Sequence, residues 1–353
     1  MLQAISLKQE EQWKRTVRRF SKWDIYYLPE YVKAFQIHGD GEPTLLFYES
    51  PSIQVLNVVM KRDISDDLRF QGEIPAKTYY DLVTPYGYGG GLIEGEKNGD
   101  ALKKYKESYE AYCASQGIVS EFVRFHPLLK NAWDLDGLYQ IQSLGATVVM
   151  NLQSPEQIWT DFSSANRNKI RKAQKNDVAV YWGRSASLLR EFQHMYNNTM
   201  DKDKATSYYY FEDEFYKSIL EDLKYHFLVF YALCQGQIAA MSLILFANQH
   251  LHYHLSASNP AFNFAAPTNI LLYESALWGV ENGCRIFHLG GGLGSSKDDL
   301  YKFKKAFNRQ ADLEFAVGRR IFSPACFNAL VEIRKKREAD FDANAAFFPL
   351  YRA

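Results

Sequence analysis

HFLVFYALCQGQIAAMSLILFANQHLHYHLS, the stretch from residue 226 to residue 256, contains three apolar runs separated by two short turns. The runs are rich in aliphatic and aromatic residues, and the turns carry Gln-Gly and Asn-Gln pairs. Apolar runs of this length joined by short polar turns predict consecutive antiparallel strands. We therefore expect strands at 226–234, 238–246 and 251–256.

A helix and a further strand are predicted directly after these strands. Residues 268–282 have the length and pattern of a helix, with Thr268 as the expected N-cap and a glycine directly after the last turn. Residues 285–289 predict a fourth strand. A Gly-rich turn at 290–296 then leads into a helix expected over 297–307.

The first half of the chain repeats this order. It carries two adjacent strand patterns, a third strand, a Gly-rich loop, a helix and a fourth strand, at 44–50, 53–63, 79–84, 85–95, 99–116 and 118–125. An order seen twice predicts an α/β fold built from two similar units of acyltransferase type. In this topology the N-terminus of the helix after the third strand binds anions, and a gap between neighbouring strands admits an acyl group. We further expect one long helix at 155–176 and a last helix within 322–342.

The composition excludes several classes of protein. The 353 residues include 41 Lys and Arg against 41 Asp and Glu, so no chain-wide basic coat is available for DNA. Apolar residues make up 47% and charged residues 23%, which excludes disorder as the main state. No apolar run approaches the roughly 18 residues of a membrane span, and the N-terminal stretch lacks the apolar core of a secretory signal. We expect a cytoplasmic protein without an integral membrane segment.

The four cysteines, Cys113, Cys234, Cys284 and Cys326, are scattered and form no CxxC pair, so neither a zinc ribbon nor a disulfide framework is indicated. His250, His252 and His254 alternate along one predicted strand. Same-face residues of a strand lie nearly 7 Å apart, so one strand does not bring three ligands to one point. We predict no metal site.

Residues 300–307, LYKFKKAF, form the strongest local motif. Three lysines and three aromatic residues follow the Gly-rich turn, a combination that suits an anionic or carbonyl-bearing ligand at a loop–helix junction. An amphipathic helix with solvated lysines explains the same pattern and is favoured by periodicity alone.

Residues 166–175, NRNKIRKAQK, place five cations within a short stretch, which makes a local surface able to contact phosphates. A solvated helix face is the simpler explanation.

Residues 84–91, TPYGYGGG, form a Gly-rich loop. Its glycines suit either close approach of the backbone to a nucleotide or a flexible loop at the edge of a cleft.

Several catalytic motifs are absent from the sequence. There is no GxSxG elbow, and residues 290–297 lack the Gly-Lys-Ser/Thr ending of a phosphate-binding loop. The loop at 257–267 also lacks the R-x-x-G-x-G/A pattern with which acetyl-CoA enzymes of this topology surround the pyrophosphate. This loop argues against acyl-CoA as the donor without excluding it.

The chain resembles the FemABX family of tandem GNAT-fold (acyl-CoA N-acyltransferase fold) aminoacyltransferases, which build peptidoglycan cross-bridges. The likeness is clearest at Arg167–Val178, Tyr253–Trp278, Gly283–Gly292 and Lys302–Phe307. It implies two tandem GNAT-like domains of mixed sheet and helices, without the coiled-coil arm of some members. It also implies that an amine of a peptidoglycan precursor attacks the aminoacyl ester at the acceptor end of a tRNA, with no cofactor beyond this donor.

The resemblance also implies roles for individual residues. Phe303-Lys304 matches the family's Phe-Lys pair, so Lys304 is expected to stabilise charge on the attacked carbonyl. An ester is already activated, so its transfer to an amine needs mainly positioning and such a cation. The expected donor-binding residues are Phe303, Tyr253, Arg167 and Lys302. The expected acceptor-binding residues are Lys33, Tyr86 and Tyr209. The family's Pro-Arg-Gly-Pro stretch appears here as Thr84-Pro85-Tyr86-Gly87, without the Arg.

The expected domains are residues 1–154 with 318–353, and residues 155–317. Two other functions remain open at this point. One keeps the fold and uses acyl-CoA as the donor of an N-acetyltransferase. The other is a non-catalytic protein that binds cell-wall precursors or glycans through an aromatic cleft, which leaves the placement of Phe303-Lys304 unexplained.

Overall fold

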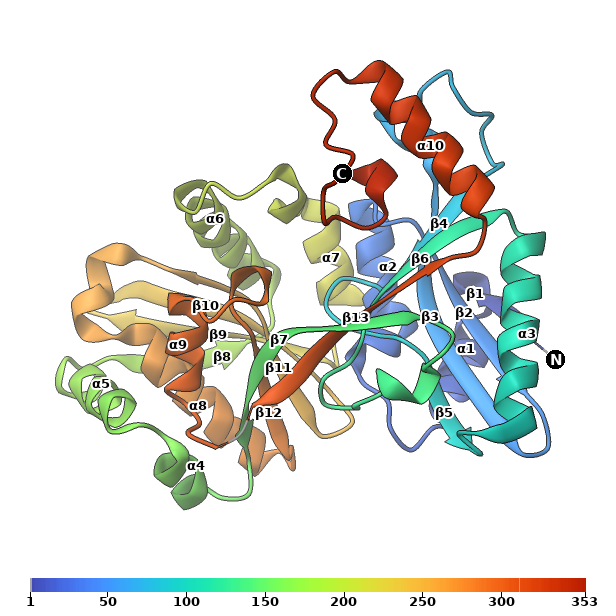
Figure 1. Cartoon of the computed structure of the whole chain (residues 1–353). Coiled ribbons are helices and arrows are strands. Elements are labelled where there is room, and N and C mark those ends of the chain that lie inside the picture. The colour runs from blue at the N-terminus through green and yellow to red at the C-terminus, as the bar shows by residue number, and fades with distance from the viewer. Residues whose placement is uncertain (1, 311) are drawn as a thin grey trace. The chain divides into compact units, whose positions relative to one another are not determined.

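The computed structural model describes residues 2–310 and 312–353, and the chain divides into two compact units (Figure 1). The first unit contains the chain up to Leu144 together with Phe315–Ala353, and the second contains Gly145–Glu314. Strands β7 (Gln140–Asn151) and β13 (Leu313–Ile321) carry the chain between the two units.

The first unit is built on a sheet with the strand order β1-β2-β3-β4-β6-β13, and the short strand β5 pairs with β3. Only β4 and β6 run parallel among the described pairs of this unit. The strands are β1 (Leu2–Ser6), β2 (Glu42–Glu49), β3 (Ile53–Asp63), β4 (Tyr80–Val83), β5 (Leu92–Gly95) and β6 (Ile118–Arg124). The helices are α1 (Glu10–Val17), α2 (Pro29–His38), α3 (Gly99–Ser115) and α10 (Pro324–Arg337).

One hydrophobic cluster of the first unit lies between α3 and the sheet. Leu102, Tyr105, Tyr109 and Cys113 recur at helical spacing on one side of α3 and pack against apolar side chains of the strands. Burial of this side holds α3 against the sheet. The many charged residues of α3 lie on the other side of the helix.

The second unit repeats the same strand pattern in the order β7-β12-β11-β10-β9-β8. Strands β9, β10 and β11 are antiparallel neighbours, β11 and β12 run parallel, and β12 pairs antiparallel with β7. The remaining strands are β8 (Ala179–Gly183), β9 (Phe227–Cys234), β10 (Gln237–Ala247), β11 (His250–Ser258) and β12 (Ile286–Gly290). The helices are α4 (Pro155–Asp161), α5 (Ser164–Lys175), α6 (Ala186–Lys202), α7 (Asp213–Glu221), α8 (Pro267–Glu281) and α9 (Asp299–Lys305).

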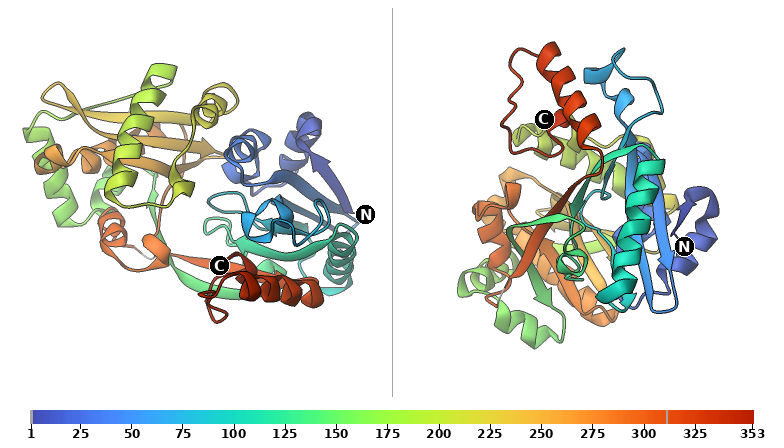
Figure 2. Two further views of the ribbon diagram at one scale, coloured as in Figure 1. Left: turned by 90° about the horizontal axis from the view of Figure 1, so that it is seen from above. Right: turned by 45° about the vertical axis from the view of Figure 1, so that its right-hand side comes forward.

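Helices cover both faces of the second sheet (Figures 1 and 2). Helix α8 connects the two parallel strands and buries Ile270, Leu271, Leu272 and Ala276 in the main core of the unit. Helix α6 lies on the opposite face, over β9, β10 and β11. A helix between parallel strands is the expected crossover, since parallel strands need a long connection.

The structure confirms the three strands predicted within residues 226–256, and it corrects two helix predictions. The prediction of a single helix at 155–176 is wrong, because this segment forms two helices, α4 and α5, with Phe162 and Ser163 between them. The Ser163 hydroxyl accepts a hydrogen bond from the Asn166 amide and thereby starts a new helix. Thr268 is not the N-cap of α8, which begins at Pro267 after Ala266 in a left-handed conformation.

Among residues 2–310 and 312–353, none of the helices combines the length and the apolarity that crossing a bilayer requires. The longest described helices, α3 and α6, have 17 residues each.

Candidate active site

The two parallel strands of the second unit separate shortly after they meet. Their pairing comprises His250 with Ile286, Leu251 with Phe287, and His252 with His288, and it ends there. Beyond His252, strand β11 continues to Ser258 with β10 on its other side. A gap between β11 and β12 therefore opens toward the C-terminal ends of both strands, as the predicted topology requires.

A cavity of about 590 Å³ occupies this part of the second unit. Its size falls in the usual range for small-molecule sites. Its wall contains the end of β11, the start of α8, part of α6 and one side of α9. The lining residues are Lys169, Thr199, Met200, Asp203, Tyr253, His254, Leu255, Ser256, Ala257, Ser258, Asn263, Ala266, Pro267, Thr268, Asn269, Leu293, Leu300, Phe303 and Lys304.

A β-bulge at His254 shapes the wall that β11 contributes. Leu243 of β10 pairs with Leu255, whereas Ile244 pairs with Tyr253, so His254 is the extra residue. A bulge re-aims side chains and breaks the strict alternation of a strand, so the three histidines do not form one regular row. Burial and the neighbouring His252 lower the pKa of His254 to about 3, which keeps its imidazole neutral.

Lys304 is the buried cation of this cavity. Its side chain is 8% exposed, and its Nζ donates a 2.7 Å hydrogen bond to the Gly291 carbonyl oxygen. The Tyr253 ring centroid lies 5.9 Å from the same atom. Burial lowers the pKa of Lys304 to about 8, and the nearby Asp298 carboxylate opposes that shift. At neutral pH the group is therefore mostly an ammonium, yet close to giving up its proton.

The start of α9 explains how Lys304 reaches this position. The Asp298 side chain accepts hydrogen bonds from the amides of Tyr301 (2.8 Å) and Leu293 (2.9 Å), so it caps α9 and holds the preceding turn. Gly292 is required in that turn, since a Cβ there would lie 2.3 Å from the Asp298 carboxylate and 2.2 Å from the Ser296 carbonyl oxygen. The Gly-rich turn thus fixes the start of the helix that carries Lys304.

Three of the predicted site residues, Lys304, Phe303 and Tyr253, line this one cavity. Phe303 also packs edge-to-face on Phe307, with ring centroids 5.4 Å apart. It also lines a smaller depression of about 250 Å³, together with Lys302. The Lys302 side chain is 70% exposed and lies 2.9 Å from the Asp299 carboxylate, so it stands at the surface.

Arg167 occupies a different position from the other predicted donor residues. Its guanidinium donates to the carbonyl oxygens of Phe162 (2.7 Å) and Trp159 (3.3 Å), at the C-terminal end of α4. Lys169, one half-turn further along α5, lines both the cavity and the depression. Asn166 accepts a 2.8 Å hydrogen bond from Asn269 and ties α5 to the first turn of α8.

The predicted acceptor residues are divided between the two units. In the first unit, the Tyr86 ring stacks on Phe35 of α2 at 5.2 Å, and its carbonyl oxygen accepts a 2.6 Å hydrogen bond from the Tyr31 hydroxyl. Lys33 lies between Tyr31 and Phe35 in α2, so the helical repeat directs it away from their side. In the second unit, Tyr209 is 38% exposed in a short 3-10 helix, Ser207–Tyr209, against Tyr208.

Helix α6 supplies cavity residues for which the sequence analysis assigned no role. Thr199, Met200 and Asp203 at its C-terminal end line the cavity opposite α9. The helical repeat of 186–202 signals an amphipathic helix, but only the fold places one end of it beside Lys304. The arrangement offers a buried ammonium, a gap between strands and a helix N-terminus, which together suit a carbonyl group that gains negative charge.

Comparisons with known proteins agree with this architecture. Residues 162–337 match the family described as the acetyltransferase (GNAT) domain. The structure of FemX superposes with a TM-score of 0.68 at 12% identity, over 93% of this chain and 99% of that one. A conserved protein of unknown function from Bacteroides thetaiotaomicron gives a TM-score of 0.55 at 12% identity, over 90% and 98%. No curated protein matches the sequence.

These findings confirm the predicted fold class, two GNAT-like α/β units of mixed sheet and helices, and the resemblance to the FemABX family. At 12% identity the likeness to FemX establishes the fold, and the chemistry is argued from the residues of the cavity.

Proposed function

We propose that this protein is an acyltransferase that transfers an aminoacyl group from the acceptor end of a tRNA to an amine of a peptidoglycan precursor. The observation that carries the proposal is Lys304, a buried ammonium in the wall of the cavity where β11 and β12 separate. The match of residues 162–337 to a GNAT acetyltransferase domain supports acyl transfer as the reaction class. The tRNA donor and the precursor acceptor rest on the likeness to FemX.

In the proposed reaction a neutral amine attacks the carbonyl carbon of the ester. A C–N bond forms, and the carbonyl oxygen becomes an oxyanion that the Lys304 ammonium stabilises through an N–H that Gly291 does not use. The C–O bond to the tRNA ribose then breaks, and the proton lost by the amine passes to the leaving oxygen. Phe303 and Tyr253 provide the apolar walls that exclude water from the ester.

The surface beside the cavity favours a phosphate-bearing donor. Lys169 and Lys302 border the depression next to Phe303. Further lysine and arginine side chains follow along α5. Lysines arranged along one surface suit the backbone of a nucleic acid, whose affinity comes mainly from phosphate contacts.

Acyl-CoA is the second candidate donor, because the matched domain family is described as an acetyltransferase. The loop before α8 gives it little support. The amides of Ala261, Phe262, Ala266 and Asn269 already donate to oxygens within the chain, so they do not form the open nest that a pyrophosphate needs.

A transfer assay with paired variants tests the proposal. The purified protein is incubated with charged tRNAs or with acetyl-CoA and an amine-bearing precursor, and acyl transfer is followed by mass spectrometry. We expect transfer from charged tRNA, and a 10²–10³-fold lower rate for Lys304→Ala, the size of effect seen when one oxyanion donor is removed. Lys305→Ala, on the same helix but paired with the Asp312 carboxylate and absent from the cavity lining, serves as the matched control and retains most of the rate.

The outcomes separate the candidates. Transfer from acetyl-CoA but from no charged tRNA contradicts the proposed donor and supports the second candidate. Tight binding of the precursor without transfer from either donor indicates a non-catalytic binding protein. A full rate for Lys304→Ala with any donor contradicts the assignment of that residue.

A further inference from the structure

A small depression of about 250 Å³ lies in the second unit, where α5 packs against α8. We call it the α5–α8 depression. Lys169, Asn269 and Phe303 line both this depression and the Lys304 cavity, so the two spaces are neighbours. The depression is smaller than the roughly 300–1,000 Å³ of a site for a whole ligand, so it accommodates a single chemical group. Its lining residues are Ala165, Asn166, Lys169, Asn269, Asp299, Lys302, Phe303 and Ala306.

Two helices begin at the α5–α8 depression. Asn166 is the third residue of α5, and Asn269 is the third residue of α8. A 2.8 Å hydrogen bond from the Asn269 Nδ2 to the Asn166 Oδ1 joins these two first turns. The amide of Ala165, also in the first turn of α5, has no carbonyl partner within its own helix. The positive ends of two helix dipoles therefore meet here, which favours an anion.

The Asn166 side chain provides a buried donor in the wall of the depression. The residue is 1% exposed, and its Oδ1 already accepts the bond from Asn269. Its Nδ2 is buried too, yet it has no hydrogen-bond acceptor among residues 2–310 and 312–353. Buried polar groups of proteins nearly always have a partner. A donor of this kind in the wall of a cavity therefore points to a ligand that brings an acceptor oxygen.

Two lysines determine the charge of the α5–α8 depression. Lys169 of α5 and Lys302 of α9 line it, and both are exposed, so they stand at its rim. Asp299 is the one carboxylate of the lining, and it lies 2.9 Å from the Lys302 ammonium. It offsets one of the two positive charges and leaves the other in addition to the two helix ends. Ammonium groups and helix N-termini both bind phosphates.

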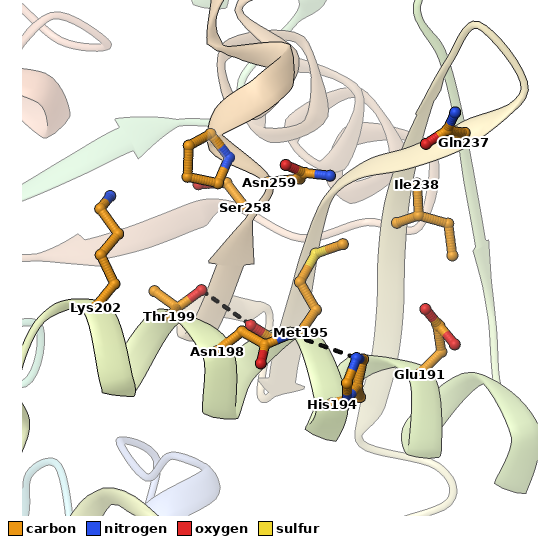
Figure 3. Close-up of a pocket in the computed structure, with 11 residues that line it drawn as sticks. Glu191, His194, Met195, Asn198, Thr199, Lys202, Gln237, Ile238, Ser258 and Asn259 are labelled. Atoms are coloured by element: carbon orange, nitrogen blue, oxygen red, sulfur yellow. Dashed lines mark hydrogen bonds between the residues drawn. The ribbon is translucent and has the colours of Figure 1, made fainter.

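A larger cavity of the second unit, about 610 Å³ beside α6, has a different chemistry (Figure 3). Its one lysine and its one carboxylate, Lys202 and Glu191, stand at opposite ends of the row of side chains that α6 presents to it. Helix α6 begins at Ala186, so its N-terminus does not face this cavity. The features that favour a phosphate group therefore gather at the α5–α8 depression and not at this larger cavity.

We propose that the α5–α8 depression binds a single phosphate group. The Asn166 Nδ2 and the Ala165 amide donate to its oxygens, and Lys169 and Lys302 balance its charge. Both candidate donors of the acyl group carry phosphates, and the free phosphate ion has the same chemistry. The inference rests on the proposed function only where the phosphate belongs to the donor. In that case the depression holds the donor while its ester lies in the neighbouring Lys304 cavity.

Binding of small phosphate probes tests the depression without any acyl transfer. Inorganic phosphate and cytidylyl-adenosine, a dinucleotide with one phosphodiester and no amino acid, are titrated separately and in competition. Phosphorus nuclear magnetic resonance measures the binding of both. We expect inorganic phosphate to bind and the dinucleotide to displace it, which assigns the depression to a phosphate of a nucleic-acid donor. Binding of inorganic phosphate that the dinucleotide does not displace assigns the depression to the free ion.

Asn166→Asp is the decisive variant. One aspartate oxygen can still accept the bond from Asn269, and a carboxylate in the first turn of α5 suits the helix dipole, so we expect the fold to be retained. The other oxygen replaces the unused donor and repels a phosphate, so the affinity for inorganic phosphate should fall at least about tenfold. Asn168→Asp, which adds the same charge to the same helix outside the depression, is the matched control and should bind normally.

Lys302→Ala is a second variant, at an exposed position that does not disturb the core. It should weaken phosphate binding by about threefold, the effect of one exposed charge. Unchanged binding by this variant overturns the proposal even if Asn166→Asp fails to fold. Equal phosphate affinity of Asn166→Asp and Asn168→Asp also overturns it, as does the absence of binding of either probe to the unaltered protein.

The failure of this inference and the failure of the proposed function give different results. Phosphate binding that Asn166→Asp weakens, without acyl transfer from any donor, supports the depression and contradicts the proposed function. Acyl transfer from charged tRNA, with phosphate binding that Asn166→Asp leaves unchanged, supports the proposed function and contradicts the depression.

Discussion

Lys304 and Gly291 are joined by a 2.7 Å hydrogen bond from the lysine Nζ to the glycine carbonyl oxygen. The bond links α9 to the residue that directly follows β12, and so fixes the ammonium at the gap between the parallel strands. An ammonium has three N–H groups, so this contact leaves others to donate into the cavity. The proposed chemistry depends on the charge of this group, and the first two predictions follow from it.

The rate of acyl transfer should fall as the pH rises through about 8. Burial lowers the pKa of Lys304 to about 8, so the stabilising ammonium is present below this pH and lost above it. The measurement is a pH–rate profile with an acceptor whose amine is already neutral at pH 7. Any activity that Lys304→Arg retains should lack the alkaline decline, since a guanidinium stays protonated. A wild-type rate that stays constant to pH 10 would exclude the charged role.

Asp298→Asn should move the alkaline decline to a lower pH. The Asp298 carboxylate favours the charged form of Lys304, and the neutral amide removes that attraction while its oxygen can still cap α9. The neighbouring Asp299→Asn is the matched control, because Asp299 pairs with the exposed Lys302 instead. The same pH–rate profile measures both variants. Identical profiles for the two would show that Asp298 has no electrostatic effect on Lys304.

Arg167→Ala should lower the free energy of unfolding by about 1–2 kcal/mol, because the carbonyl oxygens of Phe162 and Trp159 lose a charged donor. Urea denaturation measures this loss. The variant also tests the expected role of Arg167 in donor binding. An unchanged KM for the donor together with lower stability indicates a structural role, whereas a raised KM with unchanged stability indicates donor contact.

The stability of the first unit should fall as the pH rises from about 4.5 to about 7. Burial raises the pKa of Glu121 from 4.5 to about 7, although Tyr109, Tyr139 and Asn57 donate hydrogen bonds to its carboxylate. The folded protein therefore holds this proton more tightly than the unfolded chain. The resulting stabilisation is complete below the unfolded pKa and is lost as the pH passes through the folded one.

Glu121→Gln removes that titration and should flatten this part of the stability profile. The glutamine oxygen can accept from both tyrosines, and its amide can donate to the buried Asn57 Oδ1 if that side chain rotates. Glu107→Gln, at an exposed position of α3, is the control and should follow the wild-type profile. Thermal unfolding at a series of pH values provides the measurement. A slope in the Glu121→Gln profile equal to that of the wild type would assign the pH dependence to other groups.

Local patterns predicted much of the fold of the second unit. The apolar runs between 226 and 256 are strands because each buries at least one face and the turns between them are short. Periodicity did not predict the break at Phe162 and Ser163, because the helical pattern continues across it while a single capping hydroxyl, that of Ser163, starts a second helix. The cavity around Lys304 could not be predicted from local patterns, for another reason. Its walls come from α6, β11 and α9, which lie far apart along the chain, and nothing in any one of these segments alone shows that they meet.

The lysines of α9 (Lys302, Lys304 and Lys305) show which features follow from the sequence and which depend on the tertiary structure. By itself the sequence placed three lysines after a Gly-rich turn and favoured a helix there. Only the tertiary structure distinguished them, because the phase of α9 relative to β12 decides which side chain turns inward. Lys302 stays at the surface beside Asp299, Lys305 lies 2.8 Å from the Asp312 carboxylate, and Lys304 is buried on the Gly291 carbonyl oxygen. Burial from water lowers its pKa, and burial is a property of packing between distant segments.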